Sequence, residues 1–429
     1  MDMLLYSLSI GWKSIKRTPA ASIIASLAVG IGIAACTVML TMYASISRDP
    51  LSGKSDRTFH VQIDTRTGDA RKGAAYDALT YSDATELVKM PGADGPISIS
   101  YSSYLSIRSP DDRALKPTRI RAVTSQFFEV FDLQIDEGSY WSRADDDGRA
   151  RVAVISRNMS QQLFGGKSID EQILIAGKSF TVVGVRGDWS PIPRFYDLSD
   201  GVFAPVEEVM IPLESAIDLG AEPVAMVCWA EPGDVANLRS APCGWLHAWA
   251  TFQDRSDATR YFQSIRNMLS DVGLDDVDAR VRSLTVGEWI DEKQAVPKDI
   301  RLQTFLAFVF LSMCTVSVAG ILLMKYYERR REMSIRRALG ASKRTISAHI
   351  CSESLILVGA GSLLGVALGA AALKALSSLG GEYAALTELD AGVLAYVALI
   401  GFLTALLGSA AVLVKIAKSD ATDVMGAGG

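Results

Sequence analysis

The chain has 429 residues, 49% of them hydrophobic and 21% charged, and carries a formal net charge of −5 at pH 7. This length is enough for two or three domains. The apolar residues are concentrated toward the two ends, unlike the even distribution expected of a soluble enzyme. The acidic balance also argues against a nucleic-acid-binding protein, because contact with phosphates needs clustered cations.

Four stretches are long and apolar enough to cross a membrane, since about 20 apolar residues in a helix span a hydrocarbon core of about 30 Å. We predict spans at 20–43, 301–325, 345–374 and 391–415. The first is an uninterrupted run of 24 residues without a charge. It is too long for the apolar region of a cleaved signal peptide, so we predict that it stays as an anchor.

The basic residues that flank these spans predict their orientation, because cytoplasmic loops retain positive charge. The short loop 375–390 contains only acidic charges and is expected outside, together with residues 44–300. Both termini are expected inside. The flanking cations are Lys13, Lys16 and Arg17, seven Lys and Arg in 328–344, and Lys415 and Lys418.

The external region 44–300 carries a formal charge of −11, from 28 Lys and Arg against 39 Asp and Glu. Its short β-rich runs mix with helical patterns, which predicts a large α+β domain between the first and second spans. We expect two lobes, the second at about 188–250, where Pro and Gly interrupt the pattern and four of the seven Trp occur. These Trp side chains could line a ligand groove or fill a small core, and a core is the favoured interpretation.

Cys228 and Cys243 are the only cysteines of the external region. Because disulfides persist in oxidising compartments, we predict that these two residues are bonded. Closing so short a loop would stabilise the fold by about 3 kcal/mol. The alternative is two buried free thiols.

The sequence shows no recognisable catalytic or metal-binding motif. His60, His247 and His349 are the only histidines, and none has metal-ligand spacing to another or to a cysteine pair. The substring FGGKS has Gln161 where a phosphate-binding loop needs its first Gly. We therefore predict neither an enzyme nor a metal site.

The third span carries Gly361, Gly365 and Gly369, a repeat of small residues that lets another helix approach closely. Gly30 and Gly32 in the first span offer a partner surface. Glu353 is the ionisable residue deepest in an apolar run. With no second acid or Lys expected in reach, we predict that it serves as a cap or hydrogen-bonding group and not as a proton relay.

Between the second and third spans, ERRREMSIRRALGASKR reads as a cytoplasmic helix from Glu328 to Leu339 that ends at Gly340. A loop that only set topology would need fewer cations and no defined helix. RREMSIRRALGASKRTISAHICSESLILVGAGSLLGVALG resembles the signature of the FtsX-like permease family. The matching residues are Arg331, Glu332, Ile335, Arg336, Arg337, Ala338, Leu339, Gly340 and Ala341, and Glu353 falls on the family's Glu.

The whole chain resembles the MacB-like group of this family: a cytoplasmic amphipathic stretch at 1–19, one span, a large periplasmic core domain, three more spans and a cytoplasmic tail at 416–429. The tail departs from the family's Arg-rich ending. Residues 326–344 would form a coupling-helix loop. Its ATPase-coupling residues would be Glu328, Arg331, Glu332, Ile335, Arg336, Arg337, Ala338, Leu339 and Gly340.

The resemblance implies a permease subunit of an ABC transporter in the bacterial inner membrane, with export or efflux of a periplasmic substrate as its function. This chain would bind no cofactor, because ATP and Mg would be bound by a partner ATPase. A second permease subunit, identical or different, is also implied, whereas a periplasmic adaptor and an outer-membrane channel are left open. The alternative function is a non-transporting transmitter that regulates an envelope hydrolase or sensor kinase.

Overall fold

A computed structural model shows two compact units, Met1–Arg48 with Pro297–Gly429 and Asp49–Val296. The second unit is the large domain between the first and second apolar helices. The structure describes residues 19–51, 53–68, 77–91, 95–109, 117–199, 201–230, 237–295, 298–328, 335, 343–379, 386–387 and 389–418. Residues 1–18 of the N-terminal helix predicted at 1–19, and residues 419–429 of the tail predicted at 416–429, therefore lie outside the described residues.

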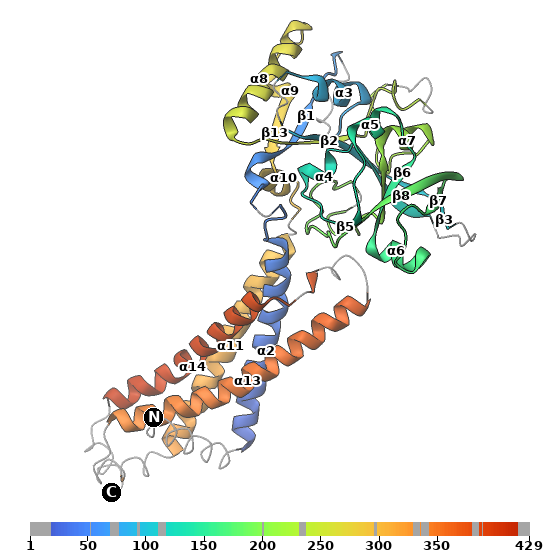
Figure 1. Cartoon of the computed structure of the whole chain (residues 1–429). Helices are drawn as coiled ribbons and strands as arrows, with labels where there is room; N and C mark the ends of the chain where they lie inside the picture. Colours follow the sequence, from blue (N-terminus) through green and yellow to red (C-terminus); the bar gives the residue numbers. More distant parts are fainter. Residues whose placement is uncertain are drawn as a thin grey trace. The chain divides into compact units, whose positions relative to one another are not determined.

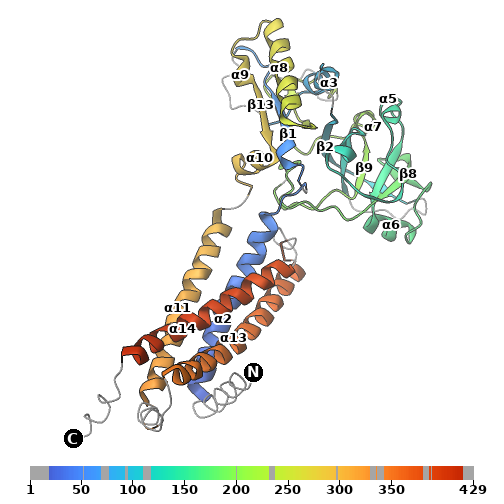
Figure 2. The ribbon, with the colours of Figure 1, turned by 60° about the vertical axis from the view of Figure 1, so that its left-hand side comes forward.

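Among its described residues, the first unit contains four long helices, which lie side by side in Figure 1 and Figure 2. All four are long and apolar enough to cross a membrane. The shortest have 28 residues, or about 42 Å at 1.5 Å per residue, so they extend beyond a hydrocarbon core. Each predicted span falls within one of them: α2 (Pro19–Ile46), α11 (Lys298–Glu328), α13 (Lys343–Leu379) and α14 (Ala391–Lys418).

Contacts between α2 and its neighbours set the directions of these helices. Ser22 near the start of α2 contacts Lys325 near the end of α11, whereas Cys36 contacts Ala307. These two helices are therefore antiparallel. Ser26 of α2 contacts Leu357 of α13. Further contacts between these two helices lie later along both of them, so α2 and α13 are parallel.

Helix α14 is antiparallel to α13, because Ser354 contacts Ala405 while the later Ser362 approaches the earlier Gly401. The start of α2, the end of α11, the start of α13 and the end of α14 thus share one end of the bundle. The basic flanks identified in the sequence all adjoin that end.

The second unit is a mixed α/β domain, which confirms the predicted fold class. Its helical elements are η1 (Ser55–Arg57), α3 (Tyr81–Lys89), α4 (Phe127–Val130), α5 (Arg143–Asp147), α6 (Arg157–Phe164), α7 (Leu213–Asp218), α8 (Arg255–Asp271), α9 (Val277–Arg280) and α10 (Val286–Glu292). Its strands are β1 (Thr58–Ile63), β2 (Ile97–Leu105), β3 (Ile107–Arg108), β4 (Thr118–Val123), β5 (Ile135–Gly138), β6 (Val152–Ser156), β7 (Gln172–Ile175), β8 (Lys178–Arg186), β9 (Val209–Pro212), β10 (Val227–Cys228), β11 (Cys243–Gly244), β12 (His247–Thr251) and β13 (Val281–Thr285).

Most strands of this domain join one 11-stranded sheet, in the order β13-β1-β12-β2-β4-β9-β6-β8-β7-β3, with β5 paired to β8. β12 lies between β1 and β2, and β9 lies between β4 and β6. Both strands come from the segment 188–250. The prediction that this segment forms a separate second lobe is therefore wrong, because β9 and β12 complete the central sheet, and only β10 and β11 form a small two-stranded sheet of their own.

The irregular pattern of that segment has a local cause. Between β8 and β9, the described residues form no strand or helix, yet Phe195 and Tyr196 are fully buried in an aromatic cluster with Trp249. Trp245 is buried in the main core. Trp189 is partly buried against the same aromatic cluster, so three of the four Trp residues fill a core, as the favoured interpretation expected. Trp229 is half-buried and lines a small pocket with Asp64 and Arg66.

The hairpin β7–β8 turns at Ala176 and Gly177, with φ values of 48° and 77°. Positive φ at both central residues is typical of a type I′ turn, whose twist matches that of the flanking strands. Gly177 adopts this conformation without a steric cost, whereas Ala176 does not.

Candidate functional site

Of the nine residues predicted to couple to an ATPase, the structure describes two. Glu328 is the last residue of α11, and Ile335 is exposed. The remaining residues predicted to couple to an ATPase, Arg331, Glu332, Arg336, Arg337, Ala338, Leu339 and Gly340, lie outside the described residues. The site that the structure does describe is the set of contacts where α11 and α13, the helices on either side of this segment, meet α2.

The three glycines of α13 face α2 at very short range. A Cβ added to Gly361 would lie 2.7 Å from the Ser26 carbonyl oxygen, and one on Gly365 would lie 2.6 Å from the Gly30 carbonyl oxygen. At Gly369 it would come within 3.0 Å of the Thr37 Cβ. The absence of side chains therefore allows backbone-to-backbone packing of these helices.

Only one of the two glycines expected to face this ridge does so. A Cβ on Gly30 would lie 3.1 Å from the Gly361 carbonyl oxygen. Gly32 points instead toward α11, where a Cβ would lie 3.0 Å from Leu311. α2 is thus packed closely against two helices through two of its faces.

A buried polar cluster joins the same three helices. The Lys325 ammonium lies 3.0 Å from Glu353 Oε1 and donates a hydrogen bond to Ser22 Oγ at 2.8 Å. The side chains of Lys325 and Glu353 are only 3% and 7% exposed. The expectation that no Lys lies within reach of Glu353 is therefore wrong, because α11 brings Lys325 to it.

Sequence reasoning missed Lys325 because this residue closes an apolar run and resembles a flanking cation. Long Lys side chains at helix ends commonly extend to the interface. Here the helix continues to Glu328, so Lys325 sits almost one turn inside α11. A second hydrogen bond, from Ser26 Oγ to the Leu357 carbonyl oxygen at 3.0 Å, continues the polar contacts between α2 and α13.

The external domain contains a buried ionic network of its own. Arg121 on β4 lies 2.8 Å from Asp197 and 3.3 Å from Glu207, and Arg194 lies 3.0 Å from Glu207. None of these four side chains is more than 3% exposed. The network joins the sheet to the segment between β8 and β9, which explains how a segment without regular structure is held on the sheet.

The charges of this network decide its ionisation. Burial raises the pKa of Asp197, but Arg121, followed by His247 and Arg194, more than offsets burial, and the pKa is held well below its usual range. Burial likewise opposes ionisation of Glu207, and the nearby arginines still lower its pKa. Both carboxylates are thus ionised at neutral pH, which suits a structural network more than acid–base catalysis.

Two histidines lie next to this network. The His60 ring centroid is 4.1 Å from that of Trp289 and 5.8 Å from that of His247. Among the described residues, neither ring nitrogen of His60 has a hydrogen-bond partner. Burial, followed by the charge of His247, lowers the pKa of His60 well below 6.5, and burial also lowers the pKa of His247.

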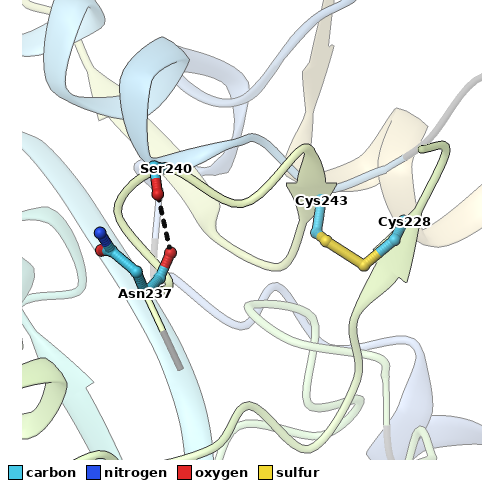
Figure 3. Close-up of a disulfide and its surroundings, with 4 residues drawn as sticks. All are labelled: Cys228, Asn237, Ser240 and Cys243. Carbon is cyan, nitrogen blue, oxygen red and sulfur yellow. Dashed lines mark hydrogen bonds between the residues drawn. A yellow bond between two sulfur atoms is a disulfide. The ribbon is translucent and has the colours of Figure 1, made fainter. Parts of the chain in front are cut away.

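Cys228 and Cys243 form a disulfide between β10 and β11, with their Cα atoms 4.0 Å apart (Figure 3). Ser240 donates a hydrogen bond to the Asn237 carbonyl oxygen close by. The bond closes a loop with a sequence separation of 15, for which a stabilisation of about 3 kcal/mol is expected. In the part of the chain that the structure describes, no group of three or more His, Cys, Asp or Glu could hold a metal ion.

Two family models match successive parts of the chain. The MacB-like periplasmic core domain matches residues 22–239, and the C-terminal domain of FtsX-like permeases matches residues 304–421. A crystal structure of the periplasmic region of MacB from Actinobacillus actinomycetemcomitans aligns with 58% of this chain and 97% of that chain, at 13% identity and a TM-score of 0.38.

Several curated proteins are similar over most of the chain. The pyoverdine export ATP-binding/permease protein PvdT of Pseudomonas syringae pv. tomato is 24% identical over 86% of this chain and 52% of its own length. The macrolide export ATP-binding/permease protein MacB of Azoarcus sp. is 25% identical over 81% of this chain and 47% of its own length. The chain thus spans about half the length of these relatives.

An uncharacterized ABC transporter permease of Bacillus subtilis, YvrN, differs in this respect. It is 23% identical over 87% of this chain and 88% of its own length. The matched core domain, the matched permease domain and the four apolar helices agree on one assignment. The chain belongs to the family of FtsX-like permeases that carry a MacB-like periplasmic core domain.

Proposed function

We propose that the chain is the permease subunit of an ABC transporter that exports a substrate from the periplasm. ATP and Mg would be bound by a separate ATPase, whose hydrolysis cycle would move the external domain through the helices of the bundle. The observation that carries this proposal is the succession of core domain and permease domain along one chain. The similarity to YvrN over nearly its whole length supports a permease that works as a separate polypeptide.

The proposed orientation places both termini and the coupling segment in the cytoplasm, and the external domain in the periplasm. The directions of the helices support it, because the starts of α2 and α13 and the ends of α11 and α14 share one end of the bundle. The basic residues adjoining that end are those expected on a cytoplasmic face. The acidic loop between α13 and α14 adjoins the opposite end.

The proposed route of coupling starts at residues Glu328–Gly340, which would seat on the ATPase. This segment lies between α11 and α13. α2 and α11 are continuous in sequence with the external domain, and α2 packs against both α11 and α13. A displacement of the segment would therefore reach the external domain along helices. We propose that two permease subunits, identical or different, assemble with the ATPase.

The coupling assignment is tested by replacing Arg336 and Arg337 with Glu. We expect the chain to insert into the membrane, because five of the seven cations in 328–344 remain, but to lose co-purification with an ATP-hydrolysing partner. The matched control is Lys343→Glu with Arg344→Glu, an equal charge change outside Glu328–Gly340. Normal ATPase association and hydrolysis in the Arg336 and Arg337 variant would contradict the assignment.

Export itself is tested in a deletion strain of the source bacterium. The relatives named for pyoverdine and macrolide export make secretion of a siderophore and resistance to macrolides the first phenotypes to measure. We expect the wild-type gene, but not the Arg336 and Arg337 variant, to restore at least one export phenotype in a panel that includes these two. Full restoration by the variant would refute ATP-driven export through this segment.

A further inference from the structure

We infer that Ser22, Lys325 and Glu353 form a polar latch that makes α2, α11 and α13 move as one body at the end where the coupling segment attaches. The inference rests on the proposed coupling function and assigns positioning residues to it. These three residues come from three different helices and meet within hydrogen-bond distance in the interior of the bundle.

The position of the latch follows from the ends of the helices. Lys325 lies three residues before the end of α11, and Glu353 lies ten residues after the start of α13, about 15 Å along that helix. The ion pair thus joins the two ends of the stretch of chain that contains the coupling segment. A force on that segment would pull α11 and α13 apart only by breaking the pair.

α13 needs such a connection more than its neighbours do. α2 and α11 continue in sequence into the external domain, whereas α13 leads only to the short connection to α14. Motion of α13 therefore reaches the external domain through its contacts with α2 or α11. The latch contacts both of these helices.

Above the latch, α13 remains in close contact with α2. Ser26 donates its hydrogen bond to Leu357, and Gly361, Gly365 and Gly369 pack against the backbone of α2. From Glu353 to Gly369 this interface is about 24 Å long. Close packing resists sliding and separation of the two helices, while the latch fixes their ends.

The chemistry of the latch makes it specific and testable. A charge buried among membrane helices is expensive unless it is paired, so removal of either Lys325 or Glu353 costs the other its ionic contact across the two helices. Exchanging the two charges keeps a pair in the same place. The fixed distance between α2 and α13 should therefore be lost in each single variant and recovered in the exchanged pair. That outcome would distinguish a latch from a general need for either side chain.

The first measurement uses the full chain alone in lipid nanodiscs. Cys36, Cys314 and Cys351 are replaced by Ala, and spin labels are attached through Ile24→Cys on α2 and Leu355→Cys on α13, whose side chains are 61% and 43% exposed. We expect one narrow distance distribution, broadened or shifted by Lys325→Met and by Glu353→Gln. Lys325→Glu combined with Glu353→Lys should restore it. Lys374→Met, which removes an exposed Lys from the same helix, should leave it unchanged.

Each result of this measurement either supports the latch or overturns it. Unchanged distances in both single variants would overturn the latch, as would an exchanged pair that behaves like the single variants although it is folded. Lys325→Arg keeps the charge and is expected to keep the distance, so it remains informative where Lys325→Met fails to fold. Because the measurement needs no ATPase, it judges the latch even where the proposed transporter function fails.

The second measurement uses the chain purified together with its ATPase. In the wild-type complex, a non-hydrolysable ATP analogue should not change the distance between the labels on α2 and α13, because these helices move together. In Glu353→Gln the analogue should change it. ATP hydrolysis should stay within about twofold of the wild-type rate, while export falls about tenfold or more, the size of a lost coupling interaction. A wild-type distance that responds to the analogue would refute the latch.

Discussion

The glycines of α13 that face α2 lead to a prediction about stability. Two Gly→Ala substitutions on this helix should change the stability of the chain in opposite directions. A Cβ at Gly365 would lie 2.6 Å from the Gly30 carbonyl oxygen and 2.8 Å from the Ile33 Cβ. At Gly359 an added Cβ meets nothing within 4 Å. Gly365→Ala and Gly359→Ala therefore add the same methyl group and the same helix propensity, and only the first disturbs α2.

The size of the expected destabilisation follows from the distances between the added Cβ and the atoms of α2. To bring the Gly365 contact from 2.6 Å to an ordinary 3.4 Å, α2 and α13 must separate by about 0.8 Å. A gap of about 0.5–1 Å already forfeits a quarter to a half of the attraction between facing atoms. Overpacking of this kind costs about 1–3 kcal/mol, whereas Gly359→Ala should be neutral or stabilise the helix by up to about 1 kcal/mol.

The assay is equilibrium unfolding of the full chain in mixed micelles with an increasing fraction of sodium dodecyl sulfate. We expect the unfolding midpoint of Gly365→Ala to fall below the wild-type value and that of Gly359→Ala to equal or exceed it. Adding Gly361→Ala to Gly365→Ala should cost less than the sum of the two, since the helices are already apart. Equal midpoints for Gly359→Ala and Gly365→Ala would refute the close packing of α2 against α13.

Three further predictions concern the external domain, each measured as the free energy of unfolding of the full chain. Asp197→Asn should destabilise it by about 3–5 kcal/mol, because Arg121 loses a buried ionic partner; a loss below about 1 kcal/mol would contradict a buried pair. The pKa of His60 is lowered in the folded state, so the unfolded chain binds the extra proton and stability should decrease as the pH falls below about 6.5. His60→Gln should reduce that decrease, and an unchanged pH dependence would show that His60 is not responsible. Ala176→Asn should stabilise the β7–β8 turn by about 0.5–1 kcal/mol, because Asn tolerates positive φ better than Ala, and a loss of stability would contradict the type I′ turn.

The sequence predicted best those features that depend on local pattern. The apolar runs placed all four helices, because a span needs only length and hydropathy. Spacing along one helix placed Gly361, Gly365 and Gly369 on one face. By contrast, the order of the sheet depends on pairings between strands far apart in the chain. β12 inserts between β1 and β2, and no local pattern in 188–250 indicates that position.

The buried charges of the external domain were missed for a related reason. Arg121 lies in a strand whose alternating pattern permits an exposed cation, and Asp197 and Glu207 lie in a segment rich in turn signals. Each residue alone reads as solvent-facing. They can be buried only because they meet, and their meeting is a property of the tertiary fold.

Two signals in the sequence, the register of the small residues and the isolated charges, together locate the latch. If α2 and α13 pack in parallel with Gly30 against Gly361, a step of eight residues toward the start of each helix leads to Ser22 and Glu353. If α11 is antiparallel to α2, its contact near Cys314 with Gly32 places the end of α11 beside the same Ser22. Lys325 is the cation available there, and a buried carboxylate requires one. The register given by small residues thus identifies which charged residues must meet, and an isolated Glu in an apolar run is better interpreted as half of a pair.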